Sequence, residues 1–404
     1  MASKAERGAE RLAPLFVESR AEARDRELEI ACRVTSPDAP PVILFGAGGL
    51  GRRVRAALAS AGAPPVAFTD NDRRLWDTSV DGVAVISPAQ AAARYAGEGL
   101  FVVTAWNPDH AFVDTARQLH RSGCREVISW IPLAWGLAAA DLLPSYAAGR
   151  PSDVLAAADR VMLAASVWAD GASLDEFVRQ TRWRLSGDFA DLADPAPDQY
   201  FPADLLTLRP GEVFVDCGAF DGDTLRELVA RCPEFGSVDA FEPDAGNFAI
   251  LQRRVATLPS RCGGRIRLHR AATDAECGAR LFAGVGASGA FVEAPAEAAV
   301  AGGAVQAESV PCVRLDDALE GVPVTFIKMD VEGAEAGTLR GAEGLLRGRR
   351  PVLAVSAYHH QADLWRLPAL LATLADDYRL HLRAHRPDGF DCVLYAIPAE
   401  RGES

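Results

Sequence analysis

The sequence predicts an α/β protein with two units, each built on a mostly parallel β-sheet. In two regions, short apolar runs rich in β-branched and aromatic residues alternate with amphipathic helical stretches, as they do where helices connect parallel strands. In each region the first apolar run ends in a glycine-rich turn that opens a helix, GAGGLG at residues 46–51 and DCGAFDG at residues 216–222. The second region closes with two neighbouring strand patterns, which predict an antiparallel hairpin at the end of its sheet.

The chain divides into four segments. Residues 1–40 are predicted to be one amphipathic helix, which packs on the chain or on a second copy in a homodimer and ends at the Pro-rich SPDAPP. Residues 41–137 are predicted to form a smaller, Rossmann-like accessory domain. Residues 138–205 show helical patterns without strand patterns, which indicates a helical connector. Residues 206–404 are predicted to form the second, larger α/β domain.

Both domains show their strands as separate apolar runs. The strands expected in the first domain are VILF, PVAFTDND, GVAVIS, LFVVTAW and EVISW, with helices between them. Five runs precede the hairpin in the second domain: EVFVDCG, SVDAFEP, RIRLHRAA, VTFIKMD and PVLAVSAY. The hairpin joins RLHLRAH to DCVLYAIP through a turn at 386–390 that contains Pro-Asp-Gly. A seven-stranded sheet with this ending is typical of class I methyltransferases and unusual for a dinucleotide-binding domain.

Composition argues against several classes of function. The 404 residues carry a formal net charge of −13, which disfavours nucleic acid and anionic membranes as partners. The eight cysteines are scattered without a CxxC pair, as expected for reduced thiols in a cytoplasmic protein. The charged N-terminus has no signal-like apolar core, and no apolar run approaches the roughly 20 residues of a membrane span.

The second glycine turn is rich in carboxylates, and these carboxylates indicate the kind of ligand that it binds. A phosphate-binding turn would carry Lys, or at least no carboxylates, beside the helix N-terminus. Here Asp216, Asp221 and Asp223 surround the two glycines. Three carboxylates suit a ligand with a cationic end and hydroxyl groups, such as S-adenosylmethionine.

Further polar residues follow the other strands of the second domain, at the sheet edge where open α/β sheets bind ligands. Glu242 ends the second strand and is suited to accept hydrogen bonds from the two hydroxyls of a ribose, with Asn247 in the helix that follows. Ala271 and Ala272 follow the third strand and leave room for an adenine ring. The remaining polar residues lie at the ends of the fourth and fifth strands: Lys328, Asp330, Glu332 and Glu335, then His359, His360 and Asp363.

These motifs carry a family resemblance. The string VDCGAFDGDT, FEPD, IKMDVEGAE, YHHQADLWRLP and VLYAIP resembles the FkbM-family, S-adenosylmethionine-dependent methyltransferases over roughly residues 175–400. The chain departs from many relatives in having GAFDGDT in place of GANxG, and His359-His360 in place of His-Lys. The resemblance implies O-methylation of a hydroxyl, as in a sugar or natural product, or of a carboxyl, with a small molecule as methyl acceptor.

The resemblance also implies which residues hold the cofactor. Gln199 and Tyr200 would cover the methionine end, Glu242 would hold the ribose, and Asp274 would face the adenine amino group. The full set of expected cofactor residues is Asp216, Gly218, Asp221, Gly222, Asp223, Thr224, Glu242, Ala271, Asp274, Asp330 and Tyr200.

Methyl transfer places further demands on the site. A hydroxyl acceptor needs a base or a metal because its free pKa lies far above 7. His359 is the first candidate base because imidazole titrates near neutrality. The other candidate catalytic residues are His360, Glu332, Glu335 and Lys328, the last as a neutralising or orienting group. Asp330 and Glu332 with His359 could hold one Mg²⁺, although no ligand spacing requires it.

The first glycine turn supports an alternative. Gly46, Gly48 and Gly51 match GxGxxG, and Asp70 ends the next strand, which is the pattern of a nucleotide site. The alternatives are therefore an NAD(P)-dependent oxidoreductase working in the first domain, or a non-catalytic binding protein on a methyltransferase fold. A further alternative is that this domain binds no nucleotide and serves as a scaffold, a substrate platform or a dimer surface.

Two other features bear on the acceptor. The small-residue segment at 284–310 is predicted to be a long loop of the kind that forms lids. Arg182, Arg184 and Arg383 could face an anionic acceptor, although Arg is common throughout this chain.

Overall fold

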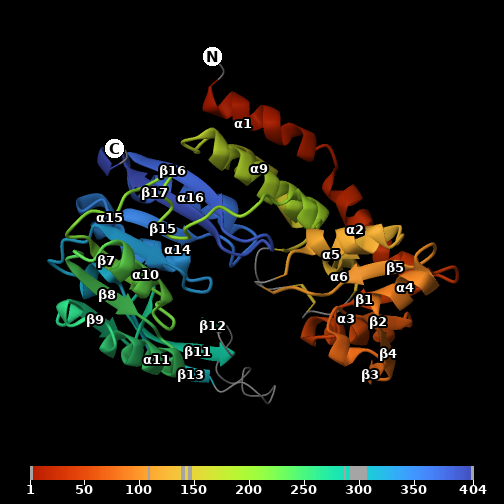
Figure 1. Ribbon diagram of the computed structural model, residues 1–404. Coiled ribbons are helices and arrows are strands. Elements are labelled where there is room, and N and C mark those ends of the chain that lie inside the picture. The colour runs from red at the N-terminus through yellow and green to blue at the C-terminus, as the bar shows by residue number, and fades with distance from the viewer. Residues whose placement is uncertain are drawn as a thin grey trace.

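The computed structural model describes residues 3–107, 110–137, 142–143, 148–285, 288–291 and 307–401. Figure 1 shows two α/β lobes side by side, the N-terminal one in red and orange and the C-terminal one in green and blue. The helices α1 (Lys4–Leu12) and α9 (Gly171–Ser186) lie together along one side of the pair. The predicted division into two α/β units with a helical connector agrees with this architecture.

The N-terminal segment contains two helices, so the prediction of a single helix over 1–40 was wrong. After α1 the chain makes a 3-10 turn at Ala13–Leu15, which contains Pro14. A second helix, α2 (Arg20–Val34), then begins at Ser19, whose side chain forms a capping box with the first turn. Pro14 lacks an N–H and Ser19 starts a new helix, so the chain changes direction between them.

The first sheet has the strand order β3-β4-β2-β1-β5-β6. Its strands are β1 (Val42–Phe45), β2 (Ala67–Thr69), β3 (Thr78–Val80), β4 (Val83–Ile86), β5 (Leu100–Val103) and β6 (Glu126–Ser129). Its helices are α3 (Gly49–Ser60), α4 (Pro88–Tyr95), α5 (Phe112–Arg121) and α6 (Trp130–Gly136). The five expected strands are confirmed. The short edge strand β3 pairs antiparallel with β4 and was not expected, because two of its three residues are exposed and give no apolar pattern.

The glycine turn of the first domain is held together by its own atoms. Asp70 accepts hydrogen bonds from the backbone N–H of Ala47 (2.9 Å) and of Asp72 (2.8 Å). A side chain at Gly51 would place its Cβ 2.0 Å from the carbonyl oxygen of Gly46, whereas a Cβ at Gly48 would meet nothing within 4 Å. Gly51 and Asp70 therefore have structural roles here, independent of any nucleotide.

The connector is helical in its described part. It contains α7 (Pro151–Ala156), α8 (Ala158–Ala164) and α9. Helix α9 begins at the capping residue Asp170 and ends at Gly187, which has the left-handed conformation (φ +68°). It packs on the last hairpin of the second domain, where the Leu382 N–H donates to the Ser173 hydroxyl at 3.0 Å.

The second sheet has the order β16-β17-β15-β14-β7-β8-β9. The strands are β7 (Val213–Cys217), β8 (Ser237–Phe241), β9 (Ile266–His269), β14 (Phe326–Met329), β15 (Val352–Ser356), β16 (Tyr378–Ala384) and β17 (Cys392–Pro398). The flanking helices are α10 (Asp223–Arg231), α11 (Ala245–Ala256), α13 (Leu315–Ala318), α14 (Glu335–Gly341), α15 (Glu343–Gly348) and α16 (Asp363–Leu374). All seven expected strands are confirmed, and β16 and β17 form the antiparallel hairpin. The strand order reverses direction between β7 and β14, which makes that gap the switch point of the sheet.

A small additional sheet includes the described ends of the segment expected to be a long loop at 284–310. Its order is β10-β13-β11-β12, with β10 (Ala272–Thr273), β11 (Gly278–Val285), β12 (Ser288–Phe291) and β13 (Ala307–Val313). The loop prediction was wrong for these residues, because small residues hid strands that pair antiparallel. Residues 292–306 lie outside the described part of the chain.

The two domains meet through aromatic rings near the turn of the last hairpin. Trp106, just after β5 of the first domain, stacks on Phe390 with 4.5 Å between ring centroids. The Trp106 indole also donates to the Asp388 carbonyl at 3.1 Å. The first domain therefore supports the hairpin turn of the second. Within the described residues, no helix combines the length and apolar character that a membrane crossing requires.

The first glycine turn yields a stability prediction. Gly51→Ala is expected to lower the free energy of unfolding of the first domain by about 1–3 kcal/mol, because its Cβ overlaps the Gly46 carbonyl. Gly48→Ala, in the same turn but with open space around it, is the matched control and should change stability by less than about 0.5 kcal/mol. Urea unfolding of both variants tests this, and equal stability would contradict it.

Candidate active site

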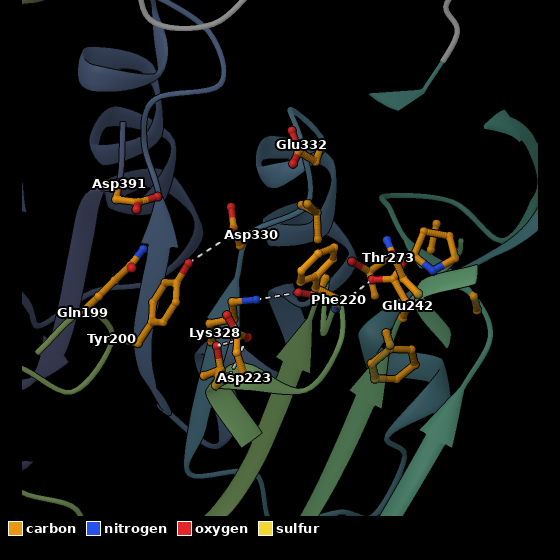
Figure 2. A pocket seen from close by; sticks show the side chains of 18 of the residues that line it. Gln199, Tyr200, Phe220, Asp223, Glu242, Thr273, Lys328, Asp330, Glu332 and Asp391 are labelled. Carbon is orange, nitrogen blue, oxygen red and sulfur yellow. Dashed lines mark hydrogen bonds between the residues drawn. The ribbon is translucent and has the colours of Figure 1, made fainter. Parts of the chain in front are cut away.

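A cavity of about 280 Å³ opens at the carboxyl ends of β7, β8 and β14, at the switch point of the second sheet. Figure 2 shows its side chains, with Glu242 and Thr273 at one end and Gln199, Tyr200 and Asp391 at the other. The lining residues are Gln199, Tyr200, Gly218, Phe220, Asp223, Thr224, Phe241, Glu242, Pro243, Asn247, Ala271, Ala272, Thr273, Lys328, Asp330, Val331, Glu332, Arg386 and Asp391.

A buried ion pair forms the floor of this cavity. Lys328 on β14 lies 3.0 Å from the Asp216 carboxylate on the neighbouring strand β7, and both side chains are almost completely buried. The Lys328 ammonium also donates to the Gly218 carbonyl at 2.6 Å. Burial raises the pKa of Asp216 to about 6 against the lowering effect of Lys328. Burial alone would lower the pKa of Lys328, but Asp216 and nearby acids raise it above its usual value. Both groups are therefore charged at neutral pH, and Lys328 holds the glycine turn in place.

The glycines of the turn are required by close contacts. Gly218 has φ +76°, and a Cβ there would lie 1.8 Å from the Asp330 carbonyl oxygen. Gly222 has φ +86° and caps α10, with the Leu251 side chain 2.9 Å from where its Cβ would be. Gly218 thus lets the backbone of the turn lie against the loop that follows β14, and Gly222 lets it lie against α11.

Glu242 links the turn to the cavity. Its carboxylate accepts the N–H of Phe220 at 2.8 Å and the N–H of Asp244 at 2.9 Å, and only 5% of the residue is exposed. Burial raises the pKa of Glu242 to about 7, against the lowering effect of these two backbone bonds. Glu242, the expected ribose ligand, therefore lies in the cavity wall and has a pKa of about 7.

Asp330 organises the opposite end. It accepts hydrogen bonds from the hydroxyls of Tyr200 (2.8 Å) and Tyr358 (3.2 Å). Burial acts to raise the pKa of Asp330, but Lys328 and His359 bring it below its ordinary value. Asp330 is therefore ionised, and its carboxylate faces the cavity near Tyr200 (Figure 2).

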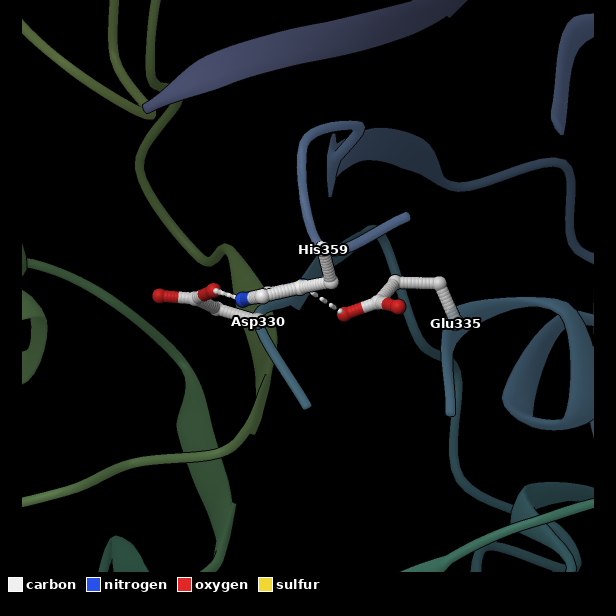
Figure 3. A group of neighbouring side chains, drawn as sticks. All are labelled: Asp330, Glu335 and His359. Carbon is white, nitrogen blue, oxygen red and sulfur yellow. Dashed lines mark hydrogen bonds and ion pairs between the residues drawn. The ribbon is translucent and has the colours of Figure 1, made fainter. Parts of the chain in front are cut away.

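His359 lies among three carboxylates beside this end of the cavity. Its Nδ1 donates to Glu335 Oε1 at 2.7 Å, and both side chains are buried (Figure 3). Its Nε2 lies 3.4 Å from Asp330 Oδ1 and 3.5 Å from Glu332 Oε2. Burial alone would lower the pKa of His359, but the three acids raise it to about 10. The ring is therefore protonated at neutral pH, a state that does not suit the expected role of general base.

Strained backbone occurs at the cavity, as it does at five non-glycine residues elsewhere in the described chain. Four lining residues other than glycine have left-handed backbone angles: Tyr200 (φ +67°), Phe220 (+47°), Glu332 (+53°) and Asp391 (+52°). Each such residue costs on the order of 1–3 kcal/mol and persists only where the surroundings enforce it. The presence of four such residues in one cavity lining supports its assignment as the functional site.

Several expected site residues lie outside the cavity lining. Asp221 forms an ion pair with Arg254, and Asp274 pairs with Arg280 at 2.8 Å. Asp216 and Gly222 are buried and do not line the cavity. His360 is half-exposed and hydrogen-bonds to Asp363, which raises its pKa.

The three candidate arginines do not line the cavity either. Arg182 is exposed, and Arg184 is buried against the Gln180 carbonyl and amide. Arg383 pairs with Asp170 and Asp204 on the far side of the hairpin. The cavity arginine is instead Arg386, paired with Asp391 at 3.1 Å.

Sequence reasoning missed some lining residues. Arg386 and Asp391 flank the Pro-Asp-Gly turn, and only the fold brings that turn to the carboxyl edge of the sheet. Phe220 and Phe241 are adjacent to the motif acids in GAFDG and FEPD. Their positions beside these motifs could have identified them as lining residues.

Residues 216–386 match the family model described as the methyltransferase FkbM domain. This part of the chain is an FkbM methyltransferase domain. The match runs from Asp216 under the cavity to Arg386 at its edge and contains most of the cavity lining. The family resemblance seen in the motifs is therefore confirmed.

Solved structures extend the likeness to the fold of the whole chain. A structure described as methyltransferase FkbM from Methylobacillus flagellatus KT has a TM-score of 0.69 and 22% identity, covering 93% of this chain and 98% of that one. At this identity the likeness shows a shared fold, across both domains. A precorrin-6y C5,15-methyltransferase from Geobacter metallireducens GS-15 has a TM-score of 0.29 and 13% identity, covering 53% of this chain and 97% of that one. No curated protein matches the sequence.

The buried pair in the FkbM domain gives a testable prediction. Lys328→Met is expected to lower the free energy of unfolding by about 3–5 kcal/mol, because it leaves the Asp216 carboxylate buried without a cation. Lys4→Met, at the other lysine of the chain, removes an exposed charge and is the control.

A second substitution separates charge from packing. Adding Asp216→Asn to Lys328→Met should restore part of the lost stability, because the uncompensated charge is gone. Urea unfolding monitored by tryptophan fluorescence provides the measurement. A Lys328→Met variant that unfolds at the wild-type urea concentration would show that the pair contributes nothing.

Proposed function

We propose that this FkbM methyltransferase uses S-adenosylmethionine and transfers its methyl group to an oxygen atom of a small molecule. The observation that carries the proposal is Glu242. Its buried carboxylate ends β8, faces the cavity and is held by backbone N–H groups, as suits an acid that accepts both ribose hydroxyls.

The shape of the cavity supports one orientation of the cofactor. Ala271 and Ala272 are small residues near Glu242, and they leave space for adenine at that end. Gln199, Tyr200 and Asp223 lie toward the other end, where the amino and carboxylate groups of the methionine moiety would bind. The sulfonium then lies near Asp330, whose negative charge complements it.

This orientation leaves Glu332 near the methyl group, because Glu332 lies on the opposite side of Asp330 from Lys328 (Figure 2). The acceptor would therefore approach from the side of Glu332 and His359. Its oxygen lone pair forms the new O–C bond while the electron pair of the S–C bond returns to sulfur, giving S-adenosylhomocysteine. A hydroxyl acceptor also gives up its proton to solvent, whereas a carboxylate acceptor has none to lose.

The first domain serves in this proposal as a support for the site. Trp106 holds the hairpin turn whose ends, Arg386 and Asp391, line the cavity. An oxidoreductase acting in the first domain is less well supported, because the match to a methyltransferase domain and the acid-lined cavity both lie in the second domain.

The proposal predicts that binding of S-adenosylmethionine depends on pH through Glu242. Burial raises its pKa to about 7, the nearby Asp244 acts in the same direction, and Lys328 opposes it. The ionised form accepts hydrogen bonds from both ribose hydroxyls, so binding favours loss of the proton. Affinity measured by calorimetry should therefore rise from roughly pH 6 to pH 8, with a slope of at most about tenfold per pH unit.

Two variants make this test specific. Glu242→Gln should weaken binding roughly 10- to 100-fold and remove this pH dependence, because it loses a charged acceptor. Asp221→Asn changes a carboxylate of the same turn that pairs with Arg254 outside the cavity, and should leave binding unchanged. Absence of binding by the wild type, or equal binding by Glu242→Gln, would overturn the proposal.

A further inference from the structure

The cavity is lined mainly by acids, whereas the expected cofactor has a zwitterionic end. At neutral pH the methionine end of S-adenosylmethionine carries one ammonium and one carboxylate group. Among the described residues, two cations line the cavity, Lys328 and Arg386. They are outnumbered by acids, which include Asp223, Glu242, Asp330 and Glu332. The carboxylate of the cofactor therefore needs one of the two cations near it, because the remaining charged lining would repel it.

Lys328 is already fully engaged by the protein. Its ammonium lies 3.0 Å from Asp216 Oδ1, 2.6 Å from the Gly218 carbonyl oxygen and 3.5 Å from the Cys217 carbonyl oxygen. An ammonium group has three N–H donors, so these three oxygens account for all of them. Moving Lys328 toward a ligand would also leave Asp216 as a buried charge without a cation. Arg386 is therefore the better candidate.

Arg386 keeps donors that a ligand can use. Its Nη1 donates to Asp391 Oδ2 at 3.1 Å, which is the one hydrogen bond that its guanidinium makes within the described part of the chain. Its Nε lies 3.9 Å from Asp388 Oδ2, beyond hydrogen-bonding distance. A guanidinium presents five N–H donors in a planar fork that matches the two oxygens of a carboxylate. Arg386 can therefore bind a second carboxylate while it keeps Asp391.

Asp391 supplies the opposite charge beside this guanidinium. Its side chain is 13% exposed and lies at the methionine end of the cavity, with Gln199 and Tyr200 (Figure 2). Burial and the nearby Asp330 raise the pKa of Asp391, against the lowering effect of Arg386. A second cation, such as an α-ammonium group, would therefore stabilise the ionised carboxylate. The two side chains together match both charges of a zwitterion.

The hairpin turn holds this ion pair in place. The Phe390 N–H donates to Asp388 Oδ1 at 3.2 Å. Trp106 of the first domain stacks on Phe390 and donates to the Asp388 carbonyl. Arg386 and Asp391 lie on either side of this fixed turn, so little ordering is needed when they bind a ligand.

We propose that the Arg386–Asp391 ion pair binds the amino-acid end of S-adenosylmethionine, with the guanidinium on its carboxylate and Asp391 on its ammonium group. This inference rests on the proposed function, which orients the methionine end of the cofactor toward this side of the cavity. The last hairpin of the sheet then contributes to cofactor binding, together with Glu242 at the ribose. The pair binds and orients the cofactor and takes no part in the transfer of the methyl group.

Three adenosine compounds test the proposal by calorimetry on the full-length protein. S-adenosylhomocysteine carries the complete amino-acid end, its decarboxylated analogue keeps only the ammonium group, and 5′-methylthioadenosine has neither charge. The wild type should bind S-adenosylhomocysteine roughly tenfold or more tightly than 5′-methylthioadenosine. Arg386→Gln should weaken binding of S-adenosylhomocysteine roughly 10- to 100-fold without weakening binding of the other two compounds. Asp391→Asn should weaken binding of both ammonium compounds by about tenfold and leave 5′-methylthioadenosine unaffected.

The control is Arg182→Gln, at an exposed arginine outside the cavity, which should bind all three compounds like the wild type. Asparagine tolerates the left-handed backbone of Asp391 (φ +52°), and circular dichroism establishes that each variant is folded. If Arg386→Gln fails to fold because Asp391 has lost its partner, the double variant with Asp391→Asn removes the unpaired charge. It should bind 5′-methylthioadenosine like the wild type and S-adenosylhomocysteine roughly tenfold or more weakly.

Three results would overturn the inference: equal wild-type affinity for S-adenosylhomocysteine and 5′-methylthioadenosine, equal losses for both compounds in Arg386→Gln, or no loss for S-adenosylhomocysteine in that variant. Absence of binding of all three compounds by the wild type would be a different result. It would overturn the proposed function itself, and this inference with it.

Discussion

The site depends on one buried ion pair between neighbouring strands. Lys328 on β14 joins Asp216 on β7 at the point where the strand order reverses. The same ammonium binds the carbonyl of Gly218, so the glycine turn is fixed to β14. Breaking the pair would leave a buried charge, which is far more costly than losing a surface contact. The cavity lies directly above this link.

The two domains share one hydrogen-bonding arrangement at their glycine turns. In each, an acid at the end of the second strand accepts an N–H from the glycine turn, Asp70 from Ala47 and Glu242 from Phe220. Glu242 is buried in a cavity wall, and burial raises its pKa to about 7. The shared geometry explains why both turns match a fingerprint, and the acidic lining explains why the proposed chemistry belongs to the second.

Most strands of the two large sheets and the main cavity acids could be predicted from the sequence, because apolar periodicity and strand-end residues are local signals. The sheet of β10 to β13 could not, since its small residues show no alternation. The contribution of Arg386 could not be read locally either, because the hairpin reaches the cavity only after folding. Asp221 was misplaced because its motif position gives no information about Arg254, which lies on the neighbouring helix.

A crystal structure with S-adenosylhomocysteine tests the central claim most directly, because it decides between the two glycine turns. The account predicts one molecule in the second domain, with its ribose hydroxyls on Glu242, its adenine beside Ala271 and its sulfur toward Asp330. Density for the nucleoside at residues 46–51 beside Asp70, or an empty cavity at saturating ligand, would contradict it.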